Sequence, residues 1–399
     1  MNKIRHYVNY LWLALAFSVP LYKPITIYLM ILIGLSLLIT GKYQNIVKRK
    51  NLLKLTLTLL WILPMFQLVL IGDLNDEWHH LEIKLSLLFF PFFLLTADFD
   101  LKKHLPNIFK MFILGCVMAS FLCLINSAFS FISSDTTSSF FYKELSIFHH
   151  PSYFALFLTF SASILLHHLV YGVKGINLNR QQSIFFILVF ALIIILLTSR
   201  SAWIIFSLLV VTFLAIAFYK KRLTNRQFSL ICFAIVIVLG TAYSQEKIRW
   251  RINEVFKYTL HASSQSNYPS STGTRSKAWE ASFNSIAHNP WLGYGLGNGN
   301  KKLKAYYNEK GYQHLYKRNT NAHNQFLQTA LDHGVLGLLC LITLTIVVGI
   351  ISLKNQKLMA IFLFIISLNF LTESMLETQS GIVFFSFFNT LFYFKLIDS

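Results

Sequence analysis

Two arginines and one histidine, Arg200, Arg275 and His323, have side chains that suit chemistry on a phosphate-bearing partner. A guanidinium binds two phosphate oxygens at once, which a lysine ammonium does less well. A neutral imidazole near pH 7 is well suited to take a proton from a hydroxyl group. These residues lie in polar or glycine-rich sequence within a mostly apolar chain, and they indicate a site for an anionic partner.

Arg200 lies in Leu197-Thr198-Ser199-Arg200-Ser201-Ala202-Trp203, which joins two apolar stretches with almost no loop between them. Two interpretations stay open. The arginine can extend its charge to the membrane interface from an otherwise apolar position. It can also bind a phosphate at the end of the helix bundle.

Arg275 follows Thr272-Gly273-Thr274, which predicts a helix start with a threonine as N-cap. A helix N-terminus beside an arginine suits an anion. The helical spacing continues over residues 275–287, with Trp279 and Phe283 four positions apart. The alternative is that Arg275 is an ordinary solvated loop charge.

His323 lies in Asn321-Ala322-His323-Asn324-Gln325-Phe326, where the chain returns to apolar sequence. A single histidine at a helix start is often structural. Here it is one of several polar groups at the same end of an apolar stretch, so we predict that it is a general base. Asn321 and Asn324 are candidates to orient the imidazole ring or a sugar.

The remaining candidates, which include Trp279 as a substrate contact, are weaker. His150 begins an apolar stretch before Pro151, and we favour an interfacial cap over a ligand contact. Glu373 and Glu377 are candidates to pair with an arginine. The glycines in 293–299 permit close backbone packing or the approach of a ligand, but they are not a dinucleotide fingerprint. The carboxylates form no metal-binding motif, so we predict a metal-independent site without a cofactor.

The composition is that of an integral membrane protein. Of the 399 residues, 55% are hydrophobic and only 13% are charged, whereas a soluble domain has about 25% charged residues. The four cysteines lie in apolar stretches and show no disulfide or zinc spacing. The net charge of +19 is distributed as a topology signal, so we predict no nucleic-acid partner.

About twelve apolar stretches are candidates to cross the hydrocarbon core, which needs roughly 17 to 25 residues each. They are residues 7–20, 24–40, 52–72, 82–97, 108–132, 152–171, 183–199, 201–219, 228–244, 324–352, 358–372 and 381–396. The first two predict a helical hairpin bent at Pro20 and Pro24 rather than a cleavable signal peptide. The predicted fold is therefore an all-α, polytopic membrane protein.

The basic residues set the predicted topology. With the N-terminus in the cytoplasm, 19 lysines and arginines lie at cytoplasmic ends and loops, against three in the short outer loops. We therefore predict cytoplasmic termini and three domains. These are a transmembrane bundle of about nine helices in residues 1–244, an outer loop domain in 245–323, and about three transmembrane helices in 324–399.

The predicted outer loop domain carries twelve basic and four acidic residues. This excess suggests an anionic partner held at the outer leaflet, with phosphate or pyrophosphate as the natural candidates. A loop of this length should contain helices, for which 275–287 and 301–309 are the candidates.

Four motifs follow one another in the second half of the chain. They are Thr198-Ser199-Arg200-Ser201-Ala202-Trp203, Arg275 ahead of Trp279, His288-Asn289-Pro290-Trp291-Leu292-Gly293-Tyr294-Gly295, and Ala322-His323-Asn324-Gln325-Phe326 with Gly334 and Gly337 downstream. In order, spacing and sidedness they resemble the O-antigen ligase and polymerase superfamily. The resemblance covers residues 185–345 in motif and the whole chain in hydropathy plan.

The resemblance implies a glycosyltransferase of the GT-C type, a multi-pass protein of the bacterial inner membrane with a periplasmic active site. Its donor would be an undecaprenyl-diphosphate-linked glycan, and its acceptor a sugar hydroxyl of lipid A core. The family's two essential arginines map onto Arg200 and Arg275, and its essential histidine onto His323. Two arginines can stabilise the diphosphate leaving group without a metal, and a single displacement would invert the anomeric centre.

Three alternatives stay open beside a ligase. A polysaccharide polymerase of similar architecture would instead join undecaprenyl-linked repeat units to a glycan acceptor. A transporter or lipid flippase would need ionisable residues near the midplane of several spans, and these are scarce. A membrane scaffold would not explain Arg200, Arg275 and His323. Besides donor and acceptor, the expected partners are membrane lipids.

Overall fold

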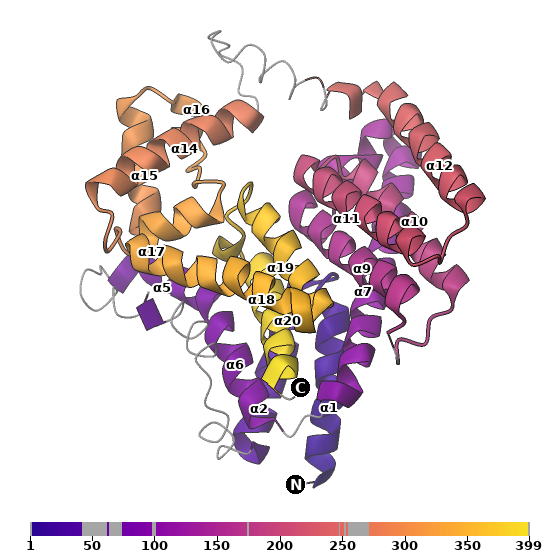
Figure 1. Ribbon diagram of the computed structural model, residues 1–399. Coiled ribbons are helices and arrows are strands. Elements are labelled where there is room, and N and C mark those ends of the chain that lie inside the picture. The colour runs from indigo at the N-terminus through magenta and orange to yellow at the C-terminus, as the bar shows by residue number, and fades with distance from the viewer. Residues whose placement is uncertain are drawn as a thin grey trace. The chain divides into compact units, whose positions relative to one another are not determined.

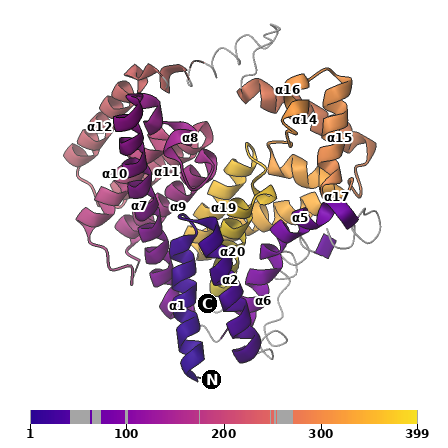
Figure 2. The same ribbon diagram turned by 180° about the vertical axis from the view of Figure 1, so that it is seen from behind.

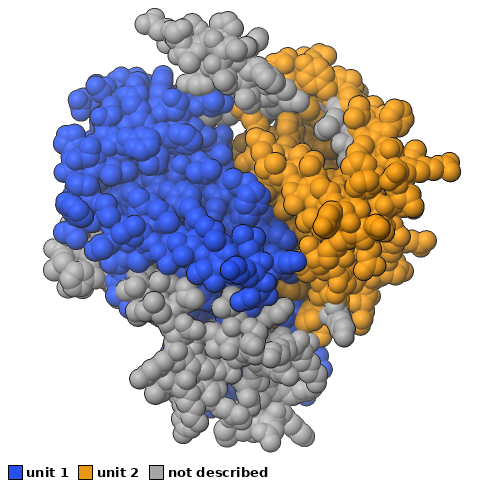
Figure 3. Space-filling model, viewed as in Figure 1, with its two compact units in different colours: residues 1–15, 23–105, 266–399 blue, residues 16–22, 106–265 orange. Residues whose placement is uncertain are grey.

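The structure is a computed structural model that describes residues 2–41, 62–63, 74–97, 101–173, 175–246, 248–250, 253 and 271–397. Every regular element in these ranges is a helix, which confirms the all-α prediction. The chain forms two compact units (Figure 3). Unit 1 contains Met1–Leu15, Lys23–Leu105 and Ser266–Ser399, and unit 2 contains Ala16–Tyr22 and Pro106–Gln265. The predicted domain boundaries at 244 and 323 concern the sides of the membrane and stay a prediction.

Five described helices are long and apolar enough to cross a membrane. They are Lys23–Thr40, His104–Ser134, Pro151–Tyr171, Arg200–Tyr219 and Gln325–Asn355. Two shorter apolar helices, Arg180–Leu196 and Lys357–Phe370, have the same character. The predicted span at 52–72 lies outside the described residues except for 62–63.

Unit 2 is built around α9 (Pro151–Tyr171), whose first fifteen residues are all buried. Helices α10 (Arg180–Leu196) and α11 (Arg200–Tyr219) pack against it, and the long α7 (Leu101–Ser134) contributes Phe112, whose ring meets those of Phe157 and Phe160. The unit also contains η1 (Thr137–Phe140), α8 (Tyr142–Leu145) and α12 (Asn225–Ser244). Apolar side chains therefore hold both ends of the short α10–α11 turn.

The helical core of unit 1 is aromatic. Trp12 of α1 (Asn2–Ser18) is fully buried against Phe90 of α6 (Ser86–Thr96) and Phe387 of α20 (Gln379–Ile397). Helix α1 ends at Ser18 and α2 (Lys23–Thr40) begins at Lys23, so the chain turns in the region of the predicted bend at Pro20 and Pro24.

One predicted span in unit 1 is wrong as a single helix. Residues 82–97 divide between α5 (Leu74–Lys84) and α6, with Leu85 between them. The last residue of α5 is Lys84, whose ammonium donates a hydrogen bond to Glu377 after α19 (Lys357–Phe370). The chain at the break between α5 and α6 is therefore held by a contact that is distant in the sequence.

The predicted span at 324–352 is also interrupted. It comprises α17 (Gln325–Ile342), a five-residue π-helix η2 (Thr343–Val347) and α18 (Val348–Asn355). Gly334 breaks α17 with φ 62° and ψ −160°, a conformation that is essentially restricted to glycine. The break lets the Trp291 carbonyl approach so closely that a Cβ on Gly334 would collide with it.

Three polar helices form a small subdomain on α17, which we call the α14–α16 subdomain. They are α14 (Ser271–His288), α15 (Asn298–Glu309) and α16 (Gln313–Lys317), and they confirm the two predicted helices. Their shared core consists of Ala278, Ala281, Leu303, Tyr307, Leu315, Ala322 and Leu331. Figures 1 and 2 show that the subdomain lies at the end of unit 1 away from both chain termini.

Candidate functional site

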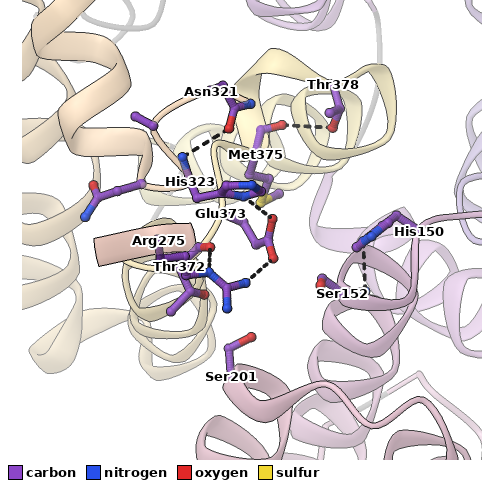
Figure 4. Close-up of polar contacts among 12 residues, drawn as sticks. His150, Ser152, Ser201, Arg275, Asn321, His323, Thr372, Glu373, Met375 and Thr378 are labelled. Atoms are coloured by element: carbon purple, nitrogen blue, oxygen red, sulfur yellow. Dashed lines mark hydrogen bonds and ion pairs between the residues drawn. The ribbon is translucent and has the colours of Figure 1, made fainter. Parts of the chain in front are cut away.

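Glu373 links two of the three predicted catalytic residues (Figure 4). Its Oε1 accepts a hydrogen bond from Nη2 of Arg275 at 2.9 Å, and its Oε2 lies 3.7 Å from Nδ1 of His323. The Glu373 side chain is 9% exposed, whereas those of Arg275 and His323 are 27% and 34% exposed. A buried carboxylate thus orients two groups that remain accessible.

Arg275 reaches this carboxylate from α14. Its Nε also donates to the Thr372 carbonyl at 3.1 Å, so the guanidinium is fixed at two points. The predicted threonine N-cap is wrong, because α14 already includes Thr272 and Thr274 and begins at Ser271. Arg275 is therefore oriented by the chain after α19 and not by a helix terminus.

Hydrogen bonds fix the position of the segment that carries Glu373. The backbone N–H groups of Thr372 and Glu373 both donate to the Asn369 carbonyl, at 3.0 Å each. Further along the same segment, the Leu376 N–H donates to Oε1 of Gln325 on α17 at 2.6 Å. This connects the Glu373 segment to the helix that begins directly after His323.

His323 occupies a left-handed backbone conformation with φ 46°. Oδ1 of Asn321 accepts its N–H at 3.0 Å, which is the local contact that closes the turn. Asn324 is the N-cap of α17, since it accepts the Leu327 N–H at 3.1 Å, and it also donates to the Leu371 carbonyl at 3.3 Å. Asn321 therefore holds the backbone of His323, and Asn324 caps the helix that follows; the predicted roles of both asparagines toward the imidazole ring or a sugar stay predictions.

Trp279 lies one helical turn after Arg275 and is half-buried. Within the part of the chain that the structure describes, its buried Nε1 has no hydrogen-bond partner. A buried indole N–H usually has an acceptor. A substrate contact by Trp279 stays a prediction.

A buried ion pair, which the sequence analysis missed, lies beside this site. Nζ of Lys84 donates to Oε1 of Glu377 at 2.9 Å, with side chains only 6% and 8% exposed. Gln325 donates to the same carboxylate oxygen at 3.3 Å. Glu377 was expected to pair with an arginine, but its partner is a lysine 293 positions away. A charged residue in a predicted span was the available signal.

The glycine-rich loop after α14 packs against α17 backbone. The N–H groups of Tyr294 and Gly295 donate to the carbonyls of Leu331 and Asp332, at 2.8 and 2.9 Å. A Cβ on Gly293 would lie 2.6 Å from the Leu331 carbonyl oxygen. Of the two roles predicted for these glycines, the structure supports close backbone packing.

The surface of the α14–α16 subdomain is cationic and aromatic. Lysine ammonium groups lie over tyrosine rings in four pairs, at 4.8 to 5.8 Å from the ring centroids. The pairs are Lys277 with Tyr312, Lys302 with Tyr294, Lys304 with Tyr316, and Lys310 with Tyr306. Burial raises the pKa of the Tyr312 and Tyr306 hydroxyls, which both donate to Glu280. The phenols therefore stay neutral and leave the positive charge in place.

Arg200 and His150 belong to unit 2. Arg200 is the first residue of α11, directly after the turn that follows α10. Nε1 of Trp203 donates to the Ile194 carbonyl at 2.9 Å and ties α11 to α10. Nδ1 of His150 accepts the Ser152 N–H at 3.4 Å, which makes it the N-cap of α9 (Figure 4). The structure supports the favoured interpretation of His150 as a cap.

No group of three or more His, Cys, Asp or Glu side chains in the described ranges is placed to hold a metal ion. Metal independence stays a prediction.

Comparison with known proteins identifies the segment in which Arg200, Arg275 and His323 lie. The family model that matches the chain is described as O-antigen ligase, and it covers residues 184–342. No curated protein matches the chain. The matched segment contains all three predicted catalytic residues and ends within α17, which confirms the resemblance to the O-antigen ligase superfamily.

Proposed function

Because residues 184–342 match the family model described as O-antigen ligase, we propose that this protein transfers a lipid-linked glycan to a sugar hydroxyl. The specific proposal is an inverting, metal-independent ligase reaction, with undecaprenyl-diphosphate glycan as donor and lipid A core as acceptor. The observation that carries it is the placement of Arg275 and His323 on the two oxygens of Glu373.

In the proposed reaction the acceptor oxygen attacks the anomeric carbon of the donor sugar. The bond from that carbon to the diphosphate oxygen breaks, and its electron pair leaves with the diphosphate. His323 takes the proton of the attacking hydroxyl. Arg275 stabilises the negative charge that develops on the leaving group, which is the usual role of a preorganised cation in group transfer.

Glu373 has two functions in this scheme. One of its oxygens accepts from Nη2 of Arg275, while the Thr372 carbonyl accepts from Nε of the same guanidinium. It also places negative charge near His323, where the imidazolium forms after proton transfer. Both functions are electrostatic and require the carboxylate to stay ionised.

Arg200 enters the proposal through its sequence motif and its position at the start of α11. We assign it the second contact to the diphosphate, as the family resemblance implies. The remaining membrane assignments are a GT-C-like arrangement of about twelve spans in the inner membrane, cytoplasmic termini and a periplasmic site. They are supported by the five apolar helices and by the position of the α14–α16 subdomain away from both termini.

A reconstituted transfer assay tests the function. Purified protein in lipid nanodiscs receives undecaprenyl-diphosphate-linked glycan and lipid A core, with EDTA present, beside a His323→Ala variant. We expect glycosylated lipid A core from the wild type and at least a hundredfold less from the variant. Equal product from both proteins would exclude His323 as the base.

The same assay separates ligase from polymerase. When lipid A core is left out and only lipid-linked repeat units are supplied, a ligase forms no longer chains. Elongation of lipid-linked chains under these conditions, without transfer to lipid A core, would assign the protein as a polymerase. Dependence on a transmembrane ion gradient, measured with the protein in sealed proteoliposomes, would instead point to transport.

A further inference from the structure

A cavity of about 650 Å³ lies within unit 2, whereas Arg275 and Glu373 belong to unit 1. Its walls come from three separate parts of the chain. They are the η1–α8 connection between α7 and α9, Thr198 in the α10–α11 turn, and the segment just after α12. By the predicted topology all three lie on the outer side of the membrane.

The walls are held by contacts that do not involve the cavity. Leu145 at the end of α8 and Ile248 after α12 are 0% and 4% exposed, so each anchors its segment by an apolar side chain. Oγ of Ser146 donates to the His149 carbonyl at 2.7 Å. The Thr198 N–H donates to the Ile195 carbonyl at 3.1 Å, and the turn around it is short. The cavity is therefore preformed, as binding sites for small molecules usually are.

The lining combines aromatic rings with charged groups. Phe141, Tyr142 and Trp250 supply the rings, and the indole of Trp250 belongs to a residue that is 59% exposed. Among the lining residues that the structure describes, one positive and two negative charges come from Lys143, Glu144 and Glu246. A diphosphate is a poor ligand for walls with an excess of carboxylate. A sugar fits them, because its apolar ring face stacks on an indole and its hydroxyls donate to carboxylates.

The position of Thr198 relates this cavity to the proposed reaction. Thr198 is buried and lines the cavity, and Arg200, the proposed diphosphate ligand, is only two residues further along the same turn. We propose that the cavity binds sugar residues of the donor glycan, close to the sugar that carries the diphosphate. This inference rests on the proposed function of Arg200, and it names a subsite that Arg200 itself does not form.

The cavity volume of about 650 Å³ limits the number of sugar rings that it can hold. It lies in the range of about 300 to 1,000 Å³ that is typical for sites of drug-sized molecules, which suits an oligosaccharide of a few rings rather than a long polymer. The subsite would then recognise the sugars nearest the reducing end, which are present in every donor whatever its chain length.

A binding experiment tests the inference without any transfer step. The probe is the oligosaccharide released from the donor by mild acid, which lacks both lipid and diphosphate, and its binding to protein in nanodiscs is followed by saturation-transfer NMR. Trp250→Ala should weaken binding about tenfold, and Trp250→Phe should keep most of it. Trp291→Ala is the matched control, because Trp291 is 72% exposed and lies in unit 1.

Kinetics give the second measurement. Trp250→Ala and Glu246→Gln should raise the KM for donor severalfold and leave kcat close to that of the wild type. Unchanged binding and unchanged KM in both variants, at unchanged thermal stability, would overturn the inference. If the oligosaccharide binds in a Trp250-dependent manner but no glycan is transferred to any acceptor, the subsite is supported and the proposed transferase reaction is overturned.

Discussion

The guanidinium of Arg275 and the carboxylate of Glu373 lie 2.9 Å apart although 98 positions separate them in the chain. The contact joins the first helix of the α14–α16 subdomain to the segment after α19. Because the second carboxylate oxygen faces His323, removal of this single side chain disturbs two proposed catalytic groups.

Glu373→Gln should lower the transfer rate by about two orders of magnitude, since the amide keeps the shape but loses the charge that holds Arg275 and stabilises the His323 imidazolium. Initial rates in the nanodisc assay measure this. Glu280→Gln is the control, because Glu280 is an exposed glutamate on α14, the helix of Arg275, and it binds Tyr306 and Tyr312 instead. Equal losses in both variants would contradict the role of Glu373.

Arg275→Lys should separate charge from geometry. Lysine keeps the positive charge but cannot span the Thr372 carbonyl and the Glu373 carboxylate while it also binds a phosphate oxygen. We expect kcat to fall about tenfold or more in the lysine variant, and by about a further tenfold in Arg275→Ala. A lysine variant with full activity would mean that only the net charge matters.

The Lys84 and Glu377 pair should show strong coupling. Removal of one partner leaves a buried charge without compensation, which typically costs about 3 to 5 kcal/mol, whereas removal of both costs less than the sum. Lys84→Met and Glu377→Gln should therefore each lower the Tm, and the double variant should recover part of the loss. Thermal unfolding in nanodiscs measures the Tm of each variant. A loss of Tm in the double variant equal to the sum of the two single losses would refute the coupling.

Gly334→Ala should be strongly destabilising. An added Cβ meets the Trp291 carbonyl, and the backbone conformation at this position is costly for any residue with a side chain. We expect little folded protein by size-exclusion chromatography. Gly240→Ala is the matched control within α12, because a Cβ there meets no heavy atom within 4 Å and alanine favours helix. Comparable yields of the two variants would contradict the packing argument.

His80 should make stability dependent on pH. Burial lowers the pKa of His80 below 6.5, although Glu377 acts in the opposite direction. Between the lowered value and 6.5 the unfolded chain binds more protons than the folded protein, so stability falls as the pH falls through this window. The Tm of the wild type should decrease from pH 7.5 to 5.5, and His80→Phe should reduce that decrease. An identical pH dependence in the variant would contradict this role.

Local sequence signals were sufficient for most helices. The observed bounds of α2, α9 and α11 differ from the predicted spans by only one residue at the start, because long apolar stretches bounded by polar residues determine them. The polar helices α14 and α15 were likewise visible from their periodicity.

Long-range contacts were not visible in the same way. The break at Gly334 exists because the loop around Trp291 lies against it, and no periodicity within α17 encodes that neighbour. Glu373 was recognised as a candidate partner for an arginine, but its link to His323 requires the chain to bring three distant segments together. The sequence showed which residue types suit the chemistry, and the structure supplied the carboxylate that pairs two of them.

The backbone of His323 implies a trade-off between durability and activity. A residue with a side chain at φ 46° pays a conformational penalty of about 1 to 2 kcal/mol that glycine avoids. An enzyme selected only for thermal resistance would therefore favour glycine at position 323, and a His323→Gly variant should be inactive yet no less stable than the wild type. At this turn the protein therefore has a lower free energy of unfolding than it would have with glycine, and it has an imidazole at the site.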